Sequence, residues 1–259
     1  MHALRHLWPL ARPFIIAATS ALALTGCGTG ISNLERPRSD NFHFSGPHPE
    51  DFAIHGIDVS KYQGNIDWNA AKASGVQFAW IKATEGGDHM DEKFQQNWFG
   101  AKAAGIPRGA YHFVFWCRPP HEEINWFKQN VPVDPDALPP VLDVEATPTS
   151  KSCKRKLIRE EVLRDMREML ADMERHYGKK PVIYVTVDFY ASIMHPNEFS
   201  DYPVWVRSTK HPPHVPYPQR QWTFWQYQSD GKVPGIRGKV DRNAFYGDAN
   251  QWRAFLAGK

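Results

Sequence analysis

The chain has 259 residues, of which 42% are hydrophobic and 13% aromatic, so it can bury one large core of barrel or sandwich size. The same composition argues against a largely disordered chain. The formal net charge is only +3 and no long basic run stands out, which argues against a nucleic-acid partner.

The N-terminal segment has the features of an export signal. Arg5 and Arg12 flank the start of the apolar run FIIAATSALALTG, which is short for a membrane span but suits a secretory signal. The run leads into Leu-Thr-Gly-Cys, which resembles the lipobox of bacterial lipoproteins. Residues 1–26 are therefore the predicted signal peptide and Cys27 is the predicted lipidation site. Cleavage after the small residues 21–23 is the alternative, and it would release a soluble, secreted protein.

Lipidation of Cys27 predicts attachment to a membrane. Gly28 follows the cysteine in place of the aspartate associated with inner-membrane retention, so by analogy we expect an outer-membrane lipoprotein that faces the periplasm. Residues 27–51 are rich in Gly, Pro, Ser and charge without periodicity, and we interpret them as a flexible tether. Residues 52–259 remain for one folded domain, which we expect to be monomeric.

Two further cysteines agree with export. Cys117 and Cys153 both follow the ends of predicted strands and are available for one disulfide in an oxidising compartment. The alternative is two unrelated buried thiols.

Eight short runs rich in β-branched and aromatic residues predict strands. They are FAIHGIDV, VQFAWIKAT, RGAYHFVF, PPVLDVE, PVIYVTV, PVWVRS, FWQYQ and KVDRNAF. Helix start and stop signals lie at 67–75, 91–105 and 121–130. A fourth helix is predicted by an apolar stripe of residues three or four apart, namely Ile158, Val162, Met166, Met169, Met173 and Tyr177.

Strand and helix alternate up to about residue 200, which predicts parallel strands with helical crossovers, and the later runs are joined by loops rich in Pro and Gly. The sequence therefore predicts a barrel whose last strands include some antiparallel pairing. In a parallel barrel the active site forms at the carboxyl ends of the strands. Polar or aromatic residues lie at or near these ends: Asp58, Lys82, Tyr111, Asp143, Glu145, Tyr184, Trp205, Gln226 and Asp241.

Asp143 and Glu145 stand two residues apart on one predicted strand, so their side chains point to the same face. Several acids gathered in one cleft cannot all ionise cheaply, so at least one of them should stay protonated near neutral pH. A proton donor beside a carboxylate is the arrangement that glycosidic bond hydrolysis requires. The alternative is a strand end with two solvated acids.

Four motifs carry a resemblance to a known family. They are DVSKYQG, IKATEGG, PPVLDVE and WQYQSDGKVPGIRGKVDRNAF, in this order. Together they resemble the glycoside hydrolase family 25 lysozymes, muramidases of the Chalaropsis type, over about residues 54–257. The resemblance implies an α/β fold, a modified (β/α) TIM-like barrel with five βα units followed by three strands joined mainly by loops.

The same resemblance implies hydrolysis of the β-1,4 bond between N-acetylmuramic acid and N-acetylglucosamine in peptidoglycan strands. It implies that Glu145 is the general acid and that Asp143 orients the substrate's own N-acetyl group as the nucleophile. Asp58 and Asp241 match two further acids of the cleft, although they could instead cap a turn or pair with Lys82 or Arg242. Whether the anomeric configuration is retained or inverted stays open.

Candidate substrate-binding residues surround these acids. Tyr62, Tyr111, Tyr184 and Trp205 can offer ring faces to a sugar, although each could equally be a core residue. Lys82 and Gln226 complete the predicted binding set, and Lys82 is better explained as an ion-pair partner than as a nucleophile. Trp80 and His89 depart from the residues usual in the family at those positions.

No metal and no other cofactor are expected. The histidines show no HExxH or similar ligand spacing, and no G-x-S-x-G motif indicates a serine nucleophile. Two alternatives to a muramidase remain. One is a noncatalytic peptidoglycan-binding protein, and the other is a chitinase, although only the last Asp-x-Glu pair of the chitinase run D-x-x-D-x-D-x-E is matched.

Overall fold

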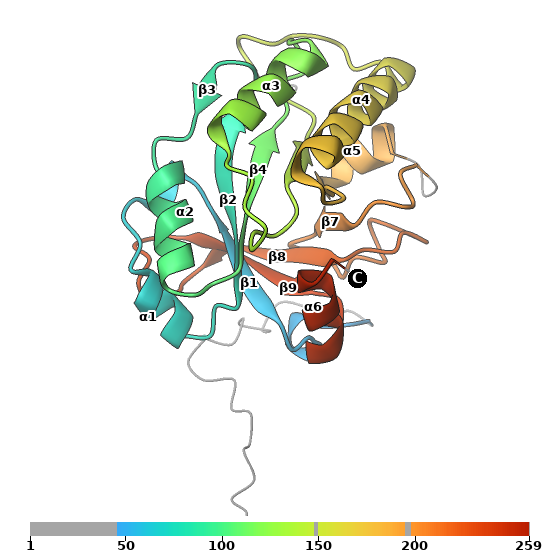
Figure 1. Cartoon of the computed structure of the whole chain (residues 1–259). Coiled ribbons are helices and arrows are strands. Elements are labelled where there is room, and N and C mark those ends of the chain that lie inside the picture. Colours follow the sequence, from blue (N-terminus) through green and yellow to red (C-terminus); the bar gives the residue numbers. More distant parts are fainter. Residues whose placement is uncertain (1–45, 148–149, 195–197, 259) are drawn as a thin grey trace, which may run out of the picture. The chain divides into compact units, whose positions relative to one another are not determined.

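The computed structural model describes residues 46–147, 150–194 and 198–258. The chain divides into two units, residues 1–30 and 31–259, and all described residues belong to the second (Figure 1). The predicted signal peptide and Cys27 lie outside the described residues. Of the predicted tether only residues 46–51 are described, and they include the 3-10 turn η2 (Pro49–Asp51).

Among the described residues, eight strands close into a barrel, as predicted. They are β1 (His55–Val59), β2 (Phe78–Glu85), β4 (Arg108–Phe113), β5 (Val141–Val144), β6 (Val182–Val185), β7 (Val204–Arg207), β8 (Phe224–Gly231) and β9 (Val240–Phe245). The sheet order is β1-β9-β8-β7-β6-β5-β4-β2-β3, and pairing of β1 with β2 closes it. Only β9 runs antiparallel to its barrel neighbours, β1 and β8.

Five helices follow the first five parallel strands (Figure 1). They are α1 (Trp68–Ala73), α2 (Phe94–Ala103), α3 (Pro120–Asn130), α4 (Arg159–Tyr177) and α5 (Val187–Ser192). Start and stop signals predicted the first three and periodicity the fourth, but the six-residue helix α5 was missed. It also missed the two-residue strand β3 (His89–Met90) and the C-terminal helix α6 (Ala249–Leu256).

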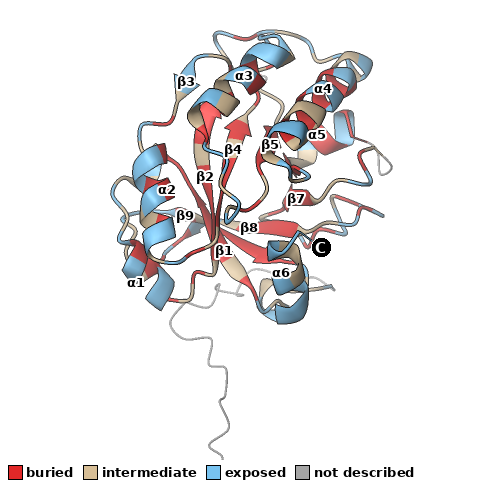
Figure 2. Ribbon diagram, in the orientation of Figure 1, coloured by how far each residue is buried: buried red, intermediate tan, exposed pale blue. Residues whose placement is uncertain are grey.

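Alternation along the strands divides the core into two layers. In β2, Phe78 and Trp80 point into the barrel, while Ala79 and Ile81 pack against the surrounding helices. Figure 2 shows the strands buried and the outward face of α4 exposed. Trp252 of α6 contacts Phe78 with ring centroids 5.4 Å apart, so α6 covers the end of the barrel at which the parallel strands begin.

The disulfide between Cys117 and Cys153 is present, as predicted. It joins the loop after β4 to the loop after β5, with the two Cα atoms 5.6 Å apart. Because both loops leave the barrel at the carboxyl ends of their strands, the bridge restrains that end. None of the described helices is both long and apolar enough to cross a membrane.

Trp80 fits inside the barrel because its neighbour on β4 has no side chain. A Cβ atom on Gly109 would lie 2.1 Å from Cζ3 of Trp80, far inside van der Waals contact. Trp80 also stacks on Trp205, with ring centroids 5.7 Å apart. The large residue at position 80, which the resemblance marked as unusual, is therefore matched by a glycine next to it.

Gly109→Ala should destabilise the fold by about 1–3 kcal/mol, because the added methyl group overpacks a filled core. In a Trp80→Leu background the same change should cost less, since the clashing ring is gone. Denaturant unfolding of the wild type, the two single variants and the double variant measures this coupling. Gly87→Ala is the control, because its Cβ would meet its nearest neighbour, Cβ of Glu122, at an ordinary 3.5 Å. Equal costs of Gly109→Ala in both backgrounds would contradict this account.

Candidate active site

The four predicted acids meet at one end of the barrel. Asp143 and Glu145 come from the carboxyl end of β5, and Asp58 comes from that of β1. Because β9 is antiparallel, Asp241 near its start pairs in register with Asp58. Residues far apart in sequence are thereby gathered where the active sites of parallel barrels form.

Asp58 is held by a network of amide and ring donors. Its Oδ2 atom accepts hydrogen bonds from Nδ2 of Asn243 at 2.8 Å and Nε2 of Gln226 at 2.9 Å. The Nε1 group of Trp205 donates to Oδ1 of Asn243 at 2.8 Å, and the hydroxyl of Tyr184 donates to Oε1 of Gln226 at 2.9 Å. The two rings thus orient the two amides so that both NH₂ groups face the carboxylate.

Burial raises the pKa of Asp58 to about 6, although hydrogen bonds from Asn243 and Gln226 favour its ionised form. Asp241 is less enclosed, yet burial and the negative charge of Asp58 raise its pKa to about 8. Asp58 and Asp241 therefore titrate around neutral pH rather than near pH 4.

The pKa of Asp143 is also strongly raised. Its side chain is buried, and its Oδ1 atom has no hydrogen-bond partner within the described residues. Burial and then the negative charge of Glu145 raise the pKa of Asp143 well above its usual range. Both effects favour the protonated form of this carboxyl group.

Glu145 lies further out at the mouth and is partly accessible. Burial raises its pKa, while the positive charges of Arg207 and Lys82 lower it. Its carbonyl oxygen accepts a hydrogen bond from Nε1 of Trp116 at 2.8 Å, which fixes the backbone at this point. A carboxyl group of raised pKa with access to solvent suits proton transfer to a ligand.

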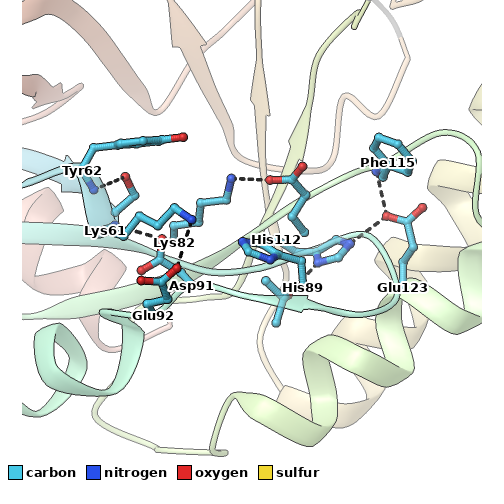
Figure 3. Close-up of polar contacts among 12 residues, drawn as sticks. Lys61, Tyr62, Lys82, His89, Asp91, Glu92, His112, Phe115 and Glu123 are labelled. Carbon is cyan, nitrogen blue, oxygen red and sulfur yellow. Dashed lines mark hydrogen bonds and ion pairs between the residues drawn. The ribbon is translucent and has the colours of Figure 1, made fainter. Parts of the chain in front are cut away.

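Lys82 pairs with Glu85, with Nζ and Oε2 2.7 Å apart, and its bond is visible in Figure 3. The interpretation of Lys82 as an ion-pair partner is therefore confirmed, but the partner is Glu85 rather than Asp58. Arg242, the other cation considered for pairing with Asp58 or Asp241, lies over the ring of Tyr227, 5.6 Å from its centroid.

Tyr62 is presented to solvent by a fixed turn directly after β1. Its side chain is 82% exposed. The turn is the 3-10 helix η3 (Lys61–Gln63), in which the backbone N–H of Lys61 donates to Oδ2 of Asp91 at 2.9 Å (Figure 3). A rigidly held, exposed ring is a suitable platform for one face of a sugar.

The other predicted binding residues lie deeper. Tyr184, Trp205 and Gln226 are buried and act on Asp58 through the amide network. Tyr111 is half-buried, and burial followed by the negative charges of Asp58 and Asp143 raises its pKa well above the usual value. Its hydroxyl group thus shares the electrostatic field of the acids.

Sequence reasoning missed Asn243, Trp116 and Arg207. Arg207 ends β7, and alternation from the inward-facing Trp205 could have placed its side chain on the barrel interior. It pairs in register with Gln226, next to the amide network. The charge of Arg207 lowers the pKa of Asp58, Glu145 and Asp241.

The described residues hold no group of three or more His, Cys, Asp or Glu side chains that could bind a metal ion. The mouth offers carboxyl groups with raised pKa values, with the cations Lys82 and Arg207 beside them. A (β/α) barrel with a buried carboxyl group of raised pKa beside a more accessible acid at this end suits the chemistry of a glycoside hydrolase.

Comparison with known proteins identifies the family. Residues 57–236 match the family described as Glycosyl hydrolases family 25, so the chain belongs to that family. It is a glycoside hydrolase of the lysozyme, or muramidase, type, and the resemblance seen in the four sequence motifs is confirmed.

Several relatives are similar along most of their length. Lysozyme M1 of Streptomyces globisporus is 36% identical over 210 residues, which cover 76% of this chain and 69% of that protein. The protein YegX of Escherichia coli strain K12 is 36% identical over 222 residues, covering 81% and 76%. The structure of a family 25 glycosyl hydrolase from Bacillus anthracis is similar with a TM-score of 0.73 and 35% identity, covering 84% of this chain and 99% of that one.

Arg207→Gln should shift the pH profile of kcat/KM to higher pH on both limbs. Loss of the cation raises the pKa of Glu145, Asp58 and Asp241. A group that must be ionised for activity then ionises only at higher pH, which moves the acidic limb. The proton donor keeps its proton up to higher pH, which moves the basic limb. Arg207→Lys, which keeps a positive charge, should shift the profile less. A profile that stays in place or moves to lower pH in Arg207→Gln would refute the electrostatic role.

Proposed function

We propose that this protein is an N-acetylmuramidase that hydrolyses the β-1,4 bond between N-acetylmuramic acid and N-acetylglucosamine in peptidoglycan. The observation that carries the proposal is the pair at the end of β5, in which a buried Asp143 of raised pKa adjoins the more accessible Glu145. The names of relatives support it, since they include Lysozyme M1 and the N,O-diacetylmuramidase of Arthroderma benhamiae.

In the free enzyme the proton shared by the pair resides on Asp143. This residue is the more deeply buried of the two, whereas Arg207 and Lys82 favour the ionised form of Glu145. When the substrate's acetamide N–H donates a hydrogen bond to Asp143, the ionised form of Asp143 gains stability and the proton passes to Glu145. Substrate binding therefore protonates the general acid, Glu145.

Glu145 then donates this proton to the glycosidic oxygen as the bond to the anomeric carbon breaks. The carbonyl oxygen of the acetamide attacks the same carbon, and Asp143 orients the group and stabilises the charge that develops on it. Water next opens the cyclic intermediate, and Glu145 takes the proton from that water. Two displacements at one carbon retain the anomeric configuration.

Asp58 and Asp241 act on this pair through their charge and do not need to contact the scissile bond. Both stand at the mouth, and Asp58 raises the pKa of Asp143, Glu145 and Asp241. Titration of these two acids around neutral pH therefore sets the pH range in which the pair holds a proton. Tyr62 lies at the rim, where its exposed ring can bind a sugar next to the cleaved one.

Glu145→Gln should lower kcat on purified peptidoglycan by about 10²–10⁴-fold, because the proton donor is lost. Asp143→Asn should also lower kcat, and the loss should be confined to substrates that carry the N-acetyl group. The measurement is the release of reducing ends that map to muramic acid. Glu160→Gln, at an exposed position on α4, is the control. Undiminished activity of Glu145→Gln would contradict the mechanism.

The enzyme is exported and anchored through a lipid on Cys27, in the outer membrane and facing the periplasm, where peptidoglycan lies. The support is the Leu-Thr-Gly-Cys stretch at residues 24–27 together with a disulfide between Cys117 and Cys153, which suits an oxidising compartment. On this proposal residues 27–51 tether a monomeric catalytic domain that spans 52–259.

Cys27→Ala should move the protein from the membrane fraction to the soluble fraction, because the acyl chains that anchor it are no longer attached. Fractionation of expressing cells and the mass of the N-terminal peptide measure the change. A wild-type chain whose N-terminus is Leu24 would instead indicate cleavage after residues 21–23 and a secreted protein. Membrane association of the Cys27→Ala variant would equally contradict lipid anchoring.

A further inference from the structure

A cavity outside the barrel is lined by residues of the loop that follows Glu145. Its volume is about 570 Å³, and the loop between β5 and α4 supplies most of its wall. Trp116, from the loop after β4, and Ile193, at the end of α5, complete the wall. The cavity thus lies at the same end of the barrel as the four acids and is large enough to hold a small ligand.

The wall of this cavity is held firmly in place. The disulfide ties Cys153 to Cys117, and the backbone N–H of Cys153 donates to Oγ of Ser150 at 3.0 Å. Nη1 of Arg155 donates to the carbonyl oxygen of Trp116 at 2.9 Å, and Nη2 of the same side chain pairs with Glu161 at 2.8 Å. These contacts fix Cys153, Trp116 and Arg155 within the wall.

Two of the cationic side chains that line the cavity have no ion-pair partner among the described residues. Arg155 and Arg159 are neutralised by ion pairs, Arg159 with Glu198 at 2.8 Å. Lys154 and Lys156 are exposed, and neither ammonium group makes an ion pair or a hydrogen bond with any described residue. The cavity thus offers two ammonium groups to an anionic ligand.

The wall of the cavity is close in the chain to Glu145, the proposed proton donor. Ala146 and Thr147 line it and follow Glu145 in the chain, so its nearest wall begins about 4 Å along the backbone from that residue. Trp116, another wall residue, is hydrogen-bonded to the carbonyl oxygen of Glu145. The cavity wall is therefore joined, through the chain and through this hydrogen bond, to the backbone that carries Glu145.

We propose that this cavity binds the peptide substituent of muramic acid, with Lys154 and Lys156 pairing with its free carboxylates. The inference rests on the proposed function, because only a glycan that carries muramic acid brings a peptide with carboxylates next to Glu145. Because both lysines are exposed, their two ion pairs add little to the binding free energy. They instead favour strands that bear peptides over strands that do not.

The test compares two substrates. One is intact peptidoglycan, and the other is the same glycan after an amidase has removed the peptides. For Lys154→Gln/Lys156→Gln, the ratio of KM on peptide-bearing strands to KM on peptide-free strands should rise about three- to tenfold over the wild-type ratio. A free stem peptide should inhibit the wild type more strongly than this variant.

Lys232→Gln/Lys239→Gln is the matched control, because it removes the same charge from the loop between β8 and β9 at the same end of the barrel. Its KM ratio should equal that of the wild type. An unchanged ratio in the Lys154 and Lys156 variant, or an equal change in the control, overturns the proposed peptide site while the muramidase function stands. If the wild type cleaves neither substrate, the proposed function itself fails and the peptide site fails with it.

Discussion

The active site depends on four carboxyl groups at one mouth of the barrel, two of them buried and two partly buried. Burial disfavours the charged form of each acid, and every acid that ionises makes ionisation of its neighbours more costly. Burial and mutual repulsion therefore raise the pKa of all four acids above their usual values. The proposed proton donation by Glu145 depends on this constraint, because the cleft must hold a proton at the working pH to deliver it to a glycosidic oxygen.

Hydrogen bonds from other strands offset part of the cost of burying Asp58. Asp58 receives two amide donors, and Trp205 and Tyr184 orient those amides from the layer below. Beneath this polar layer the interior is packed with aromatic side chains, and Trp80 stacks on Trp205 as a base for the hydrogen-bonding rings. Gly109 makes room for that base, so a glycine remote from the chemistry contributes to the orientation of a carboxylate at the mouth.

Positive charge is distributed in two zones around the acids. Arg207 and Lys82 lie at the mouth, where they favour the ionised form of Glu145 and thereby keep its proton transferable. Lys154 and Lys156 lie in the cavity outside the barrel, and its wall is held by the disulfide and by Arg155. The inner zone adjusts proton affinity and the outer zone faces the ligand, so one end of the barrel carries both the reaction and the proposed selectivity for peptide-bearing strands.

The sequence by itself determined the eight strands, the shared face of Asp143 and Glu145, and the cysteine pair, because periodicity and local motifs encode these features within a few residues. The four family motifs likewise identified the fold and the acids. Tertiary structure alone decided that Asn243 and Gln226 orient Asp58, that Lys82 pairs with Glu85, and that Arg207 acts on the acids. These contacts depend on how β1, β7, β8 and β9 meet when the barrel closes, and pairing between strands nearly 190 residues apart leaves no local pattern. The six-residue helix α5 was missed because it lacks the side-chain N-cap and the following glycine that marked α1, which is equally short.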